Sequence, residues 1–154
     1  MIIRTLFEHS EKCRHLLADA LGGINPAEFV DVAPGERSSL RALLMHIVQV
    51  EDLWINERLQ AKPVPEYNPD DFMAPFALFD HWETLPGSTR AFIESLTPEK
   101  LQQPVTATLR DGSTRQASVE KILLHLFLHE AHHRGQVAQA LRRRGFDPPD
   151  FDLV

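Results

Sequence analysis

Cysteine is nearly absent from this sequence of 154 residues, since Cys13 is the only one, and no disulfide can form within the chain. Such a composition fits a reducing compartment. Long apolar runs are absent too, so no segment is suited to span a bilayer. The first residues lack the apolar core and cleavage site of a signal peptide. We therefore expect a cytoplasmic protein with no membrane partner, and we interpret Cys13 as a structural thiol.

Positive charge is also scarce. Asp and Glu number 22 against 16 Lys and Arg, which gives a net charge of -6 with histidine neutral. Domains that bind nucleic acids carry a basic footprint, so we expect no nucleic-acid partner. The one basic run, formed by Arg142, Arg143 and Arg144, directly precedes Gly145. Because cations are favoured in the last turn of a helix, we interpret this run as a charged helix end rather than a phosphate site.

The apolar residues, in contrast, are plentiful and follow a helical period. At 43% hydrophobic composition the chain can bury the core of one domain, residues 1–154. Helical spacing recurs over about residues 2–21, 39–59, 71–96 and 119–144. Ser38 or Ser39 can cap the second helix, Ser118 can cap the fourth, and Gly145 can end it. Pro86 lies inside the third stretch, so we expect a kink or two shorter helices there.

The helical period is lost between the third and fourth stretches. Residues 105–109 alternate loosely, Asp111 and Gly112 form a tight-turn dipeptide, and residues 113–116 lead away. This pattern predicts a short hairpin that packs against the helices. The predicted fold is therefore all-α: an antiparallel four-helix bundle with a short β-hairpin inserted between helices 3 and 4. The residues after Gly145 contain two prolines and should be extended.

Eight histidines are many for this length, and their placement points to a metal site. The core-facing stripe of the fourth helix consists of Val119, Ile122, Leu126, Val137 and Ala140. His129 and His133 fall within it, one turn apart, where two rings can present nitrogens to one ion. His46 lies on the core-facing stripe of the second helix and is the candidate third ligand. The alternative is three interior histidines satisfied by ordinary hydrogen bonds.

Three neutral imidazoles would leave a divalent ion its full charge and open positions for water, as in catalytic sites. Zinc and nickel are the leading candidates for this ion. Which of the two is bound depends on how much of each metal the cell supplies. Beside the triad, His125 and His132 flank the stripe, and Gln136 can hydrogen-bond a ligand ring. Arg134 can reach a substrate carboxylate or simply a surface acid. Gly135 in mid-helix suggests close packing against a neighbour.

This part of the sequence resembles a known signature. Residues 129–136, HEAHHRGQ, match the H-x-x-x-H-R-G-Q pattern of the DinB/YfiT-like superfamily, bacterial four-helix bundles with a three-histidine metal site. The resemblance extends to the segment LLMH at residues 43–46, to the hairpin and to the end of the fourth helix. It implies His46, His129 and His133 as ligands and a homodimer. Some members of the superfamily are thiol transferases or isomerases that use bacillithiol or mycothiol.

The same residues also satisfy H-E-x-x-H, the zinc-protease signature, with Glu130 as the catalytic base. Such a protease should bring a sheet that binds its peptide substrate, and this chain has room only for a hairpin. Glu130 can still activate water, or its carboxylate can simply bond a neighbouring histidine or arginine. We rank the zinc-dependent hydrolase of this type last.

The expected function is a metal-dependent transferase or hydrolase that acts on a small molecule, with a low-molecular-weight thiol as possible co-substrate. The alternative is a non-catalytic, stress-associated metal-binding bundle, in which His125, His132 or Glu130 closes the fourth coordination position. On the fourth helix, the side opposite the stripe is also apolar, with Leu124, Leu128 and Ala131. That side should contact a second subunit, as in a homodimer, or be covered within the chain.

Overall fold

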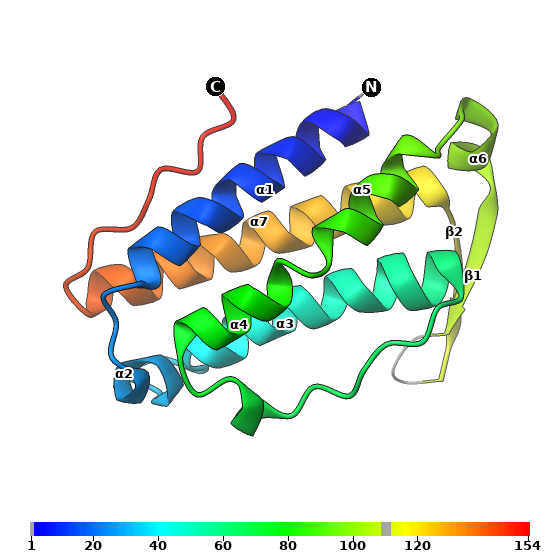
Figure 1. The fold of residues 1–154 in the computed structure, drawn as a ribbon. Coiled ribbons are helices and arrows are strands. Elements are labelled where there is room, and N and C mark those ends of the chain that lie inside the picture. The colour runs from blue at the N-terminus through cyan, green and yellow to red at the C-terminus, as the bar shows by residue number, and fades with distance from the viewer. Residues whose placement is uncertain (1, 109–111) are drawn as a thin grey trace.

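A computed structural model describes residues 2–108 and 112–154 of the chain. Within them, four long helical runs lie side by side and form a bundle (Figure 1). The runs are α1 (Ile2–Leu21), α3 (Leu40–Asp52) with the π-helix η1 (Leu53–Leu59), α4 (Pro75–Trp82) with α5 (Pro86–Glu94), and α7 (Val119–Arg143). The predicted all-α bundle is confirmed, and the third run is split before Pro86 as expected.

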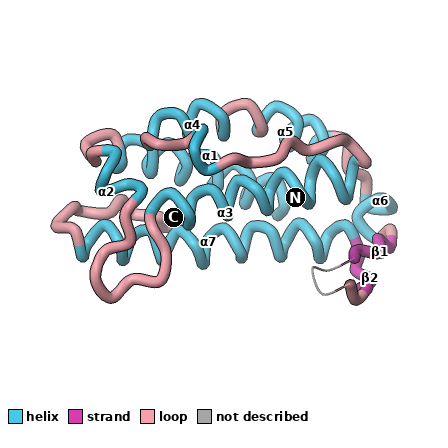
Figure 2. The backbone as a smooth tube through the Cα atoms, turned by 90° about the horizontal axis from the view of Figure 1, so that it is seen from below, coloured by secondary structure: helices cyan, strands magenta, loops and turns pink. Residues whose placement is uncertain are grey.

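Short elements connect these runs. They are α2 (Pro26–Val30), the 3-10 turn η2 (Pro69–Asp71), α6 (Pro98–Gln102), β1 (Pro104–Thr108) and β2 (Thr114–Ser118). The strands pair antiparallel, with Pro104 opposite Ser118, at the end of the bundle where α7 begins (Figure 2). The hairpin inserted before the last helix is thus confirmed. The expected turn residues Leu109 and Asp111 lie outside the described residues.

Capping residues set where α3 and α7, the two helices that carry His46, His129 and His133, begin and end. The hydroxyl of Ser39 accepts a hydrogen bond from the backbone of Ala42, and that of Ser118 accepts one from Lys121. Each bond satisfies an N–H that has no partner inside the helix. Gly145 follows α7 with a φ of +82°, a conformation that glycine adopts without strain. The boundaries of α3 and α7 therefore follow from local chemistry that the sequence displays.

The π-helix and α2 were not expected. Helical periodicity does not distinguish a π-helical stretch from an α-helix, because the apolar spacing changes by only one residue. In η1 the side chain of Asn56 is buried, donates to Asp52 (2.6 Å) and accepts from Ser88 of α5 (2.8 Å). The α2 turn starts on Asn25 and Pro26, where Asn25 caps the turn and proline occupies its first position.

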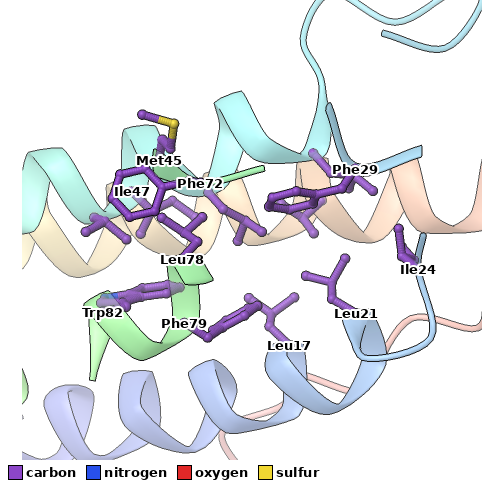
Figure 3. Packing of buried hydrophobic residues seen from close by; sticks show 14 of the residues in the cluster. Leu17, Leu21, Ile24, Phe29, Met45, Ile47, Phe72, Leu78, Phe79 and Trp82 are labelled. Atoms are coloured by element: carbon purple, nitrogen blue, oxygen red, sulfur yellow. The ribbon is translucent and has the colours of Figure 1, made fainter. Parts of the chain in front are cut away.

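Two apolar clusters fill the bundle. Figure 3 shows the first, in which Phe79 and Trp82 of α4 pack among side chains of α1 and α3, including Leu17 and Ile47. The second cluster, around Phe7 and Phe127 with their neighbours, occupies the other end. The predicted stripe of α7 is buried throughout. On α7 the segment between the two clusters, residues 129–134, is mostly polar, and it carries the histidines.

No described helix is long and apolar enough to cross a membrane.

Candidate metal centre

Three histidines from two helices meet at one point in the middle of the bundle. The Nε2 atom of His129 lies 3.0 Å from that of His46 and 3.0 Å from that of His133. His46 belongs to α3, whereas the other two are one turn apart on α7. All three are partly buried, and their ligand atoms lie within 4.8 Å of one another. The structure therefore brings together the three residues that the sequence singles out as ligands.

The geometry of these nitrogens fits a shared ion. A zinc–nitrogen bond is about 2.0–2.1 Å long, so two nitrogens bound to the same ion are no more than about 4 Å apart. The two separations from His129, 3.0 Å each, lie inside that limit, and all three ligand atoms lie within 4.8 Å of one another. The ring centroids are 4.3 Å to 4.8 Å apart and the rings meet edge to face, so the Nε2 atoms converge while the rings avoid overlap. The residues present therefore fit a divalent metal ion.

The protonation of these rings also suits coordination. Burial, together with the nearby rings of His133 and His46, lowers the pKa of His129 to about 4. The ring is therefore neutral near pH 7 and keeps a lone pair for a metal. Its Nδ1 atom is buried and has no hydrogen-bond partner among the described residues. This ring does not recover its full desolvation cost from the surrounding protein, and a bond from Nε2 to a metal would offset part of that cost.

Gln136 fixes the orientation of the His133 ring. Its side-chain oxygen lies 2.7 Å from Nδ1 of His133, which therefore donates and leaves Nε2 unprotonated. Its amide nitrogen lies 3.2 Å from Nε2 of His132, and this second bond holds the amide in that orientation. The supporting position expected for Gln136 is the one it occupies. His132 is exposed and takes part through Gln136 rather than as a member of the cluster.

His125 and Glu130 lie beside the triad without joining it. The ring of His125 is exposed, 6.1 Å from that of His129, and meets the Trp54 ring edge to face. Glu130 is buried and does not belong to the group of ligand atoms around His129. Its carboxylate accepts from Ser10 of α1 (2.7 Å) and from Arg134 (2.6 Å). A catalytic role for Glu130 remains an untested prediction.

Arg134 is buried with Glu130, four residues away on the same helix. We expected Arg134 to contact a substrate carboxylate or a surface acid, and the acid that it contacts in the structure is instead buried. Its guanidinium lies 5.8 Å from the ring centre of Phe151, in the tail that runs back along α1 (Figure 1). The Glu130–Arg134 ion pair also links α7 to α1, because Ser10 of α1 donates a hydrogen bond to the Glu130 carboxylate.

A pocket of about 490 Å³ opens beside the triad. His46 and His133 line one part of it, and the loop of residues 35–38 with the last turns of α7 lines the rest. Its charged lining residues are Glu36, Arg37 and Arg143. Sequence reasoning did not find this pocket, because Arg37 lies in a loop without periodicity and Arg143 belongs to the run explained by the helix dipole.

A second, more apolar groove of about 430 Å³ runs between α1, α7 and the tail. Leu124, Leu128 and Ala131 line it, and Leu128 is 71% exposed. The tail contributes Phe151 and Leu153 but leaves Leu128 uncovered. Gly135 lies on the same side, and a Cβ added there would meet nothing within 4 Å. The close packing expected of Gly135 is therefore wrong within this chain.

Two further buried polar networks stabilise the helices around the site. Glu51 of α3 accepts from Arg14, Trp82 and Thr89, each at 2.9 Å, so its carboxylate joins α1, α4 and α5. Asp52, next along the chain, accepts from the hydroxyl of Tyr67 at 2.9 Å. Burial and the bond to Asp52 raise the pKa of Tyr67 well above its usual value. Both networks are internal, and neither adds a ligand to the triad.

Comparisons with known proteins agree with this fold. The model of the DinB family matches residues 2–154. A DinB-like protein from Bacillus subtilis has a similar structure, with a TM-score of 0.69, 21% identity, and coverage of 96% of this chain and 97% of its own. A DinB-like protein from Bacillus cereus gives a TM-score of 0.65, 21% identity, and coverage of 96% and 91%. No curated protein matches. At this identity the solved structures establish the fold alone.

Proposed function

The chain belongs to the DinB family, and we propose that it is a metal-dependent transferase or hydrolase acting on a small molecule. The reaction takes place at a divalent ion held by His46, His129 and His133. A low-molecular-weight thiol serves as co-substrate. The ion is zinc or nickel, according to supply in the cell.

One observation carries this proposal: three convergent imidazole nitrogens border a pocket large enough for a small molecule. His46 and His133 belong both to the triad and to the lining of the pocket of about 490 Å³. Binding sites for small molecules commonly have volumes of about 300–1,000 Å³. Sites with three protein ligands and an accessible position are typical of catalytic metals, whereas structural sites are closed by four.

The contacts of the side chains near the triad support an open fourth coordination position on an ion bound there. Glu130 is engaged by Ser10 and Arg134, and Nε2 of His132 is engaged by Gln136. The His125 ring faces Trp54. None of the three belongs to the cluster of converging ligand atoms. A non-catalytic, stress-associated metal-binding bundle would need one of them to close the site, so these contacts favour the enzyme.

The chain's own residues prepare the site for this chemistry. Gln136 keeps the proton of His133 on Nδ1, and burial keeps His129 neutral. When bound, the ion would polarise a substrate or lower the pKa of a coordinated water or thiol. The buried Glu51 and Glu130 networks hold α1, α3 and α7 at fixed positions, so that the ligands from different helices remain aligned.

The zinc-protease interpretation gains no support. Among the described residues the only sheet is the β1–β2 hairpin, which lies at the end where α7 begins. The carboxylate that would act as base is held in the ion pair with Arg134.

We further propose that the protein is a cytoplasmic homodimer with no nucleic-acid partner. The apolar groove supports a self-association surface, because Leu128 at 71% exposure lies beside Leu124 and Ala131 on one side of α7. A contiguous exposed apolar patch of this kind commonly marks an interface.

The test combines metal analysis with an activity screen. Protein loaded with zinc or nickel is assayed for thiol transfer and for hydrolysis over a broad substrate panel. The proposal expects turnover that disappears on chelation and in His129→Ala, and that survives in His125→Ala, whose ring is exposed and outside the cluster. Equal turnover in the His129→Ala variant, or none in any metal-loaded form, would contradict it.

A further inference from the structure

The pocket beside the triad is long and ends far from the histidines. Along α7 its wall is formed by Gln136, Ala140 and Arg143, which follow one another at helical spacing. From His133 to Arg143 the helix rises by about 15 Å, since each residue adds about 1.5 Å. The other wall comes from the first turns of α3 and from the loop before it. A ligand that uses the whole pocket is therefore an extended molecule with two distinct ends.

The far end of this pocket is cationic, although the chain as a whole is acidic. Glu36 contributes the carboxylate among the lining residues, and it is ion-paired with Arg144 at 2.6 Å with its side chain 6% exposed. Its charge is therefore already compensated. Arg37 is exposed and forms no hydrogen bond or ion pair with the described residues. Arg143 donates from one nitrogen to the backbone oxygen of Gly35 at 3.0 Å, and this bond fixes its position.

An arginine fork of this kind recognises anions. The planar guanidinium presents several N–H donors and binds a carboxylate or phosphate through paired hydrogen bonds. The backbone bond from Arg143 to Gly35 uses one nitrogen and leaves other donors of that group available. The N-terminus of α3, at Leu40, lies near the same end and adds partial positive charge. The pocket thus carries two arginine side chains and a helix end, and Arg143 is bonded to the loop that holds Arg37.

We propose that Arg37 and Arg143 bind the acidic group, a carboxylate or phosphate, of an extended small molecule whose opposite end reaches the histidine triad. This inference rests on the proposed function for the role of the triad and adds the chemical class of the substrate. The arginines are specificity residues: they select acidic molecules and set the distance between the acidic group and the atom that reacts. Neutral molecules of the same length bind more weakly.

The test uses thiols that differ only at the far end. Cobalt(II) is loaded into the triad as a spectroscopic probe, and thiolate binding is followed by its charge-transfer absorption. The probes are 6-mercaptohexanoate, 6-mercaptohexyl phosphate and the neutral 6-mercaptohexanol. Loss of one charge-assisted contact costs about tenfold in affinity. We therefore expect at least one acid to bind about tenfold more tightly than the alcohol, and the tighter acid identifies the preferred group.

The variants show which residues are responsible. In the double variant Arg37→Gln with Arg143→Gln, the preference for the acid should disappear while affinity for the alcohol stays unchanged. The matched control removes two charges elsewhere, by Arg142→Gln with Arg115→Gln. Both of these side chains are exposed and outside the pocket lining. Equal binding of acids and alcohol to the unaltered protein, or a preference that survives in the pocket variant, would overturn the inference.

A second measurement separates this inference from the proposed function. If cobalt does not bind at the triad, the proposed function fails, and the arginines are then tested on the metal-free protein. Hexanoate and hexyl phosphate are titrated while backbone amide signals of Gly35, Ser38 and Gln139 are followed by NMR. Shifts that vanish in the Arg37→Gln, Arg143→Gln variant support the acidic site. Shifts that are absent from the unaltered protein, or unchanged in the variant, refute it.

Discussion

The side-chain oxygen of Gln136 lies 2.7 Å from Nδ1 of His133, and this one contact determines which nitrogen of the ring faces the other two histidines. Supporting bonds of this type commonly contribute about 10–100-fold to metal affinity. In Gln136→Met the acceptor is lost while length is kept, so we expect metal affinity to fall by about tenfold or more. Competition with a chromophoric chelator measures the change.

Gln139→Met is the matched control for this substitution. Gln139 lines the same pocket on the same helix but makes no hydrogen bond to a ligand ring in the described structure. Its variant should retain the affinity of the unaltered protein. Equal affinities for the Gln136 and Gln139 variants would show that the contact to His133 does not orient the ligand.

Metal stoichiometry distinguishes the triad from the histidines beside it. His129 lies within 3.0 Å of both other ligand nitrogens, so His129→Ala removes the central member and should abolish stoichiometric binding. His125→Ala and His132→Ala remove exposed rings outside the cluster and should leave the stoichiometry unchanged. Elemental analysis after dialysis measures the metal content per protein chain. A full complement of metal in the His129→Ala protein would exclude the assigned ligands.

Tyr67 provides a pH prediction that can be read optically, because it is the only tyrosine in the chain. Burial and the bond to Asp52 raise its pKa in the folded state. The unfolded chain releases this proton near pH 10 and the folded chain holds it, so the unfolded state binds fewer protons above that pH. Stability from this group is therefore complete below about pH 10 and declines as the pH rises.

Phenolate absorption measures this directly. We expect no phenolate signal near pH 10 while the helical circular dichroism persists, and its appearance only together with unfolding. Tyr67→Phe should flatten the alkaline decline in stability and cost about 1–3 kcal/mol at neutral pH, because Asp52 loses a buried partner. A folded protein that titrates like free tyrosine would contradict the buried bond to Asp52.

Leu128 tests the proposed self-association surface. Its side chain is 71% exposed, so Leu128→Glu should leave the thermal stability of the isolated chain nearly unchanged while it converts a dimer to a monomer in sedimentation equilibrium. Phe76→Glu is the control, since Phe76 on α4 is 69% exposed and lies outside the groove. A protein that is monomeric before substitution, or a Leu128→Glu dimer, would refute this surface.

The meeting of the three histidines was predictable from the sequence because helical periodicity reports which face of a helix is buried. His129 and His133 fell on the core stripe of one helix and His46 on that of another, and the structure joins them. The hairpin and the break before Pro86 followed from turn and backbone chemistry in the same way. These features depend on local spacing, which a single sequence displays in full.

The pocket arginines and the buried ion pairs depend instead on contacts between distant segments. Glu130 and Arg134 stand four residues apart, so their pairing is readable from the sequence, but their burial against Ser10 is not. Arg143 fits the helix dipole and the pocket equally well on sequence grounds. Only the packing of the loop of residues 35–38 against α7 separates the two roles. The π-helix could not be predicted from the sequence, because its apolar pattern resembles that of an α-helix.

The separation of the ligands along the chain has a consequence for unfolding. His46 and His129 are 83 positions apart, so an ion bound to both closes a large loop through the bundle. In a protein with a single cysteine, this would be a reversible counterpart of a disulfide, restricting the unfolded ensemble for as long as the ion stays bound. Availability of metal would then govern how long the folded chain survives as well as whether it can react.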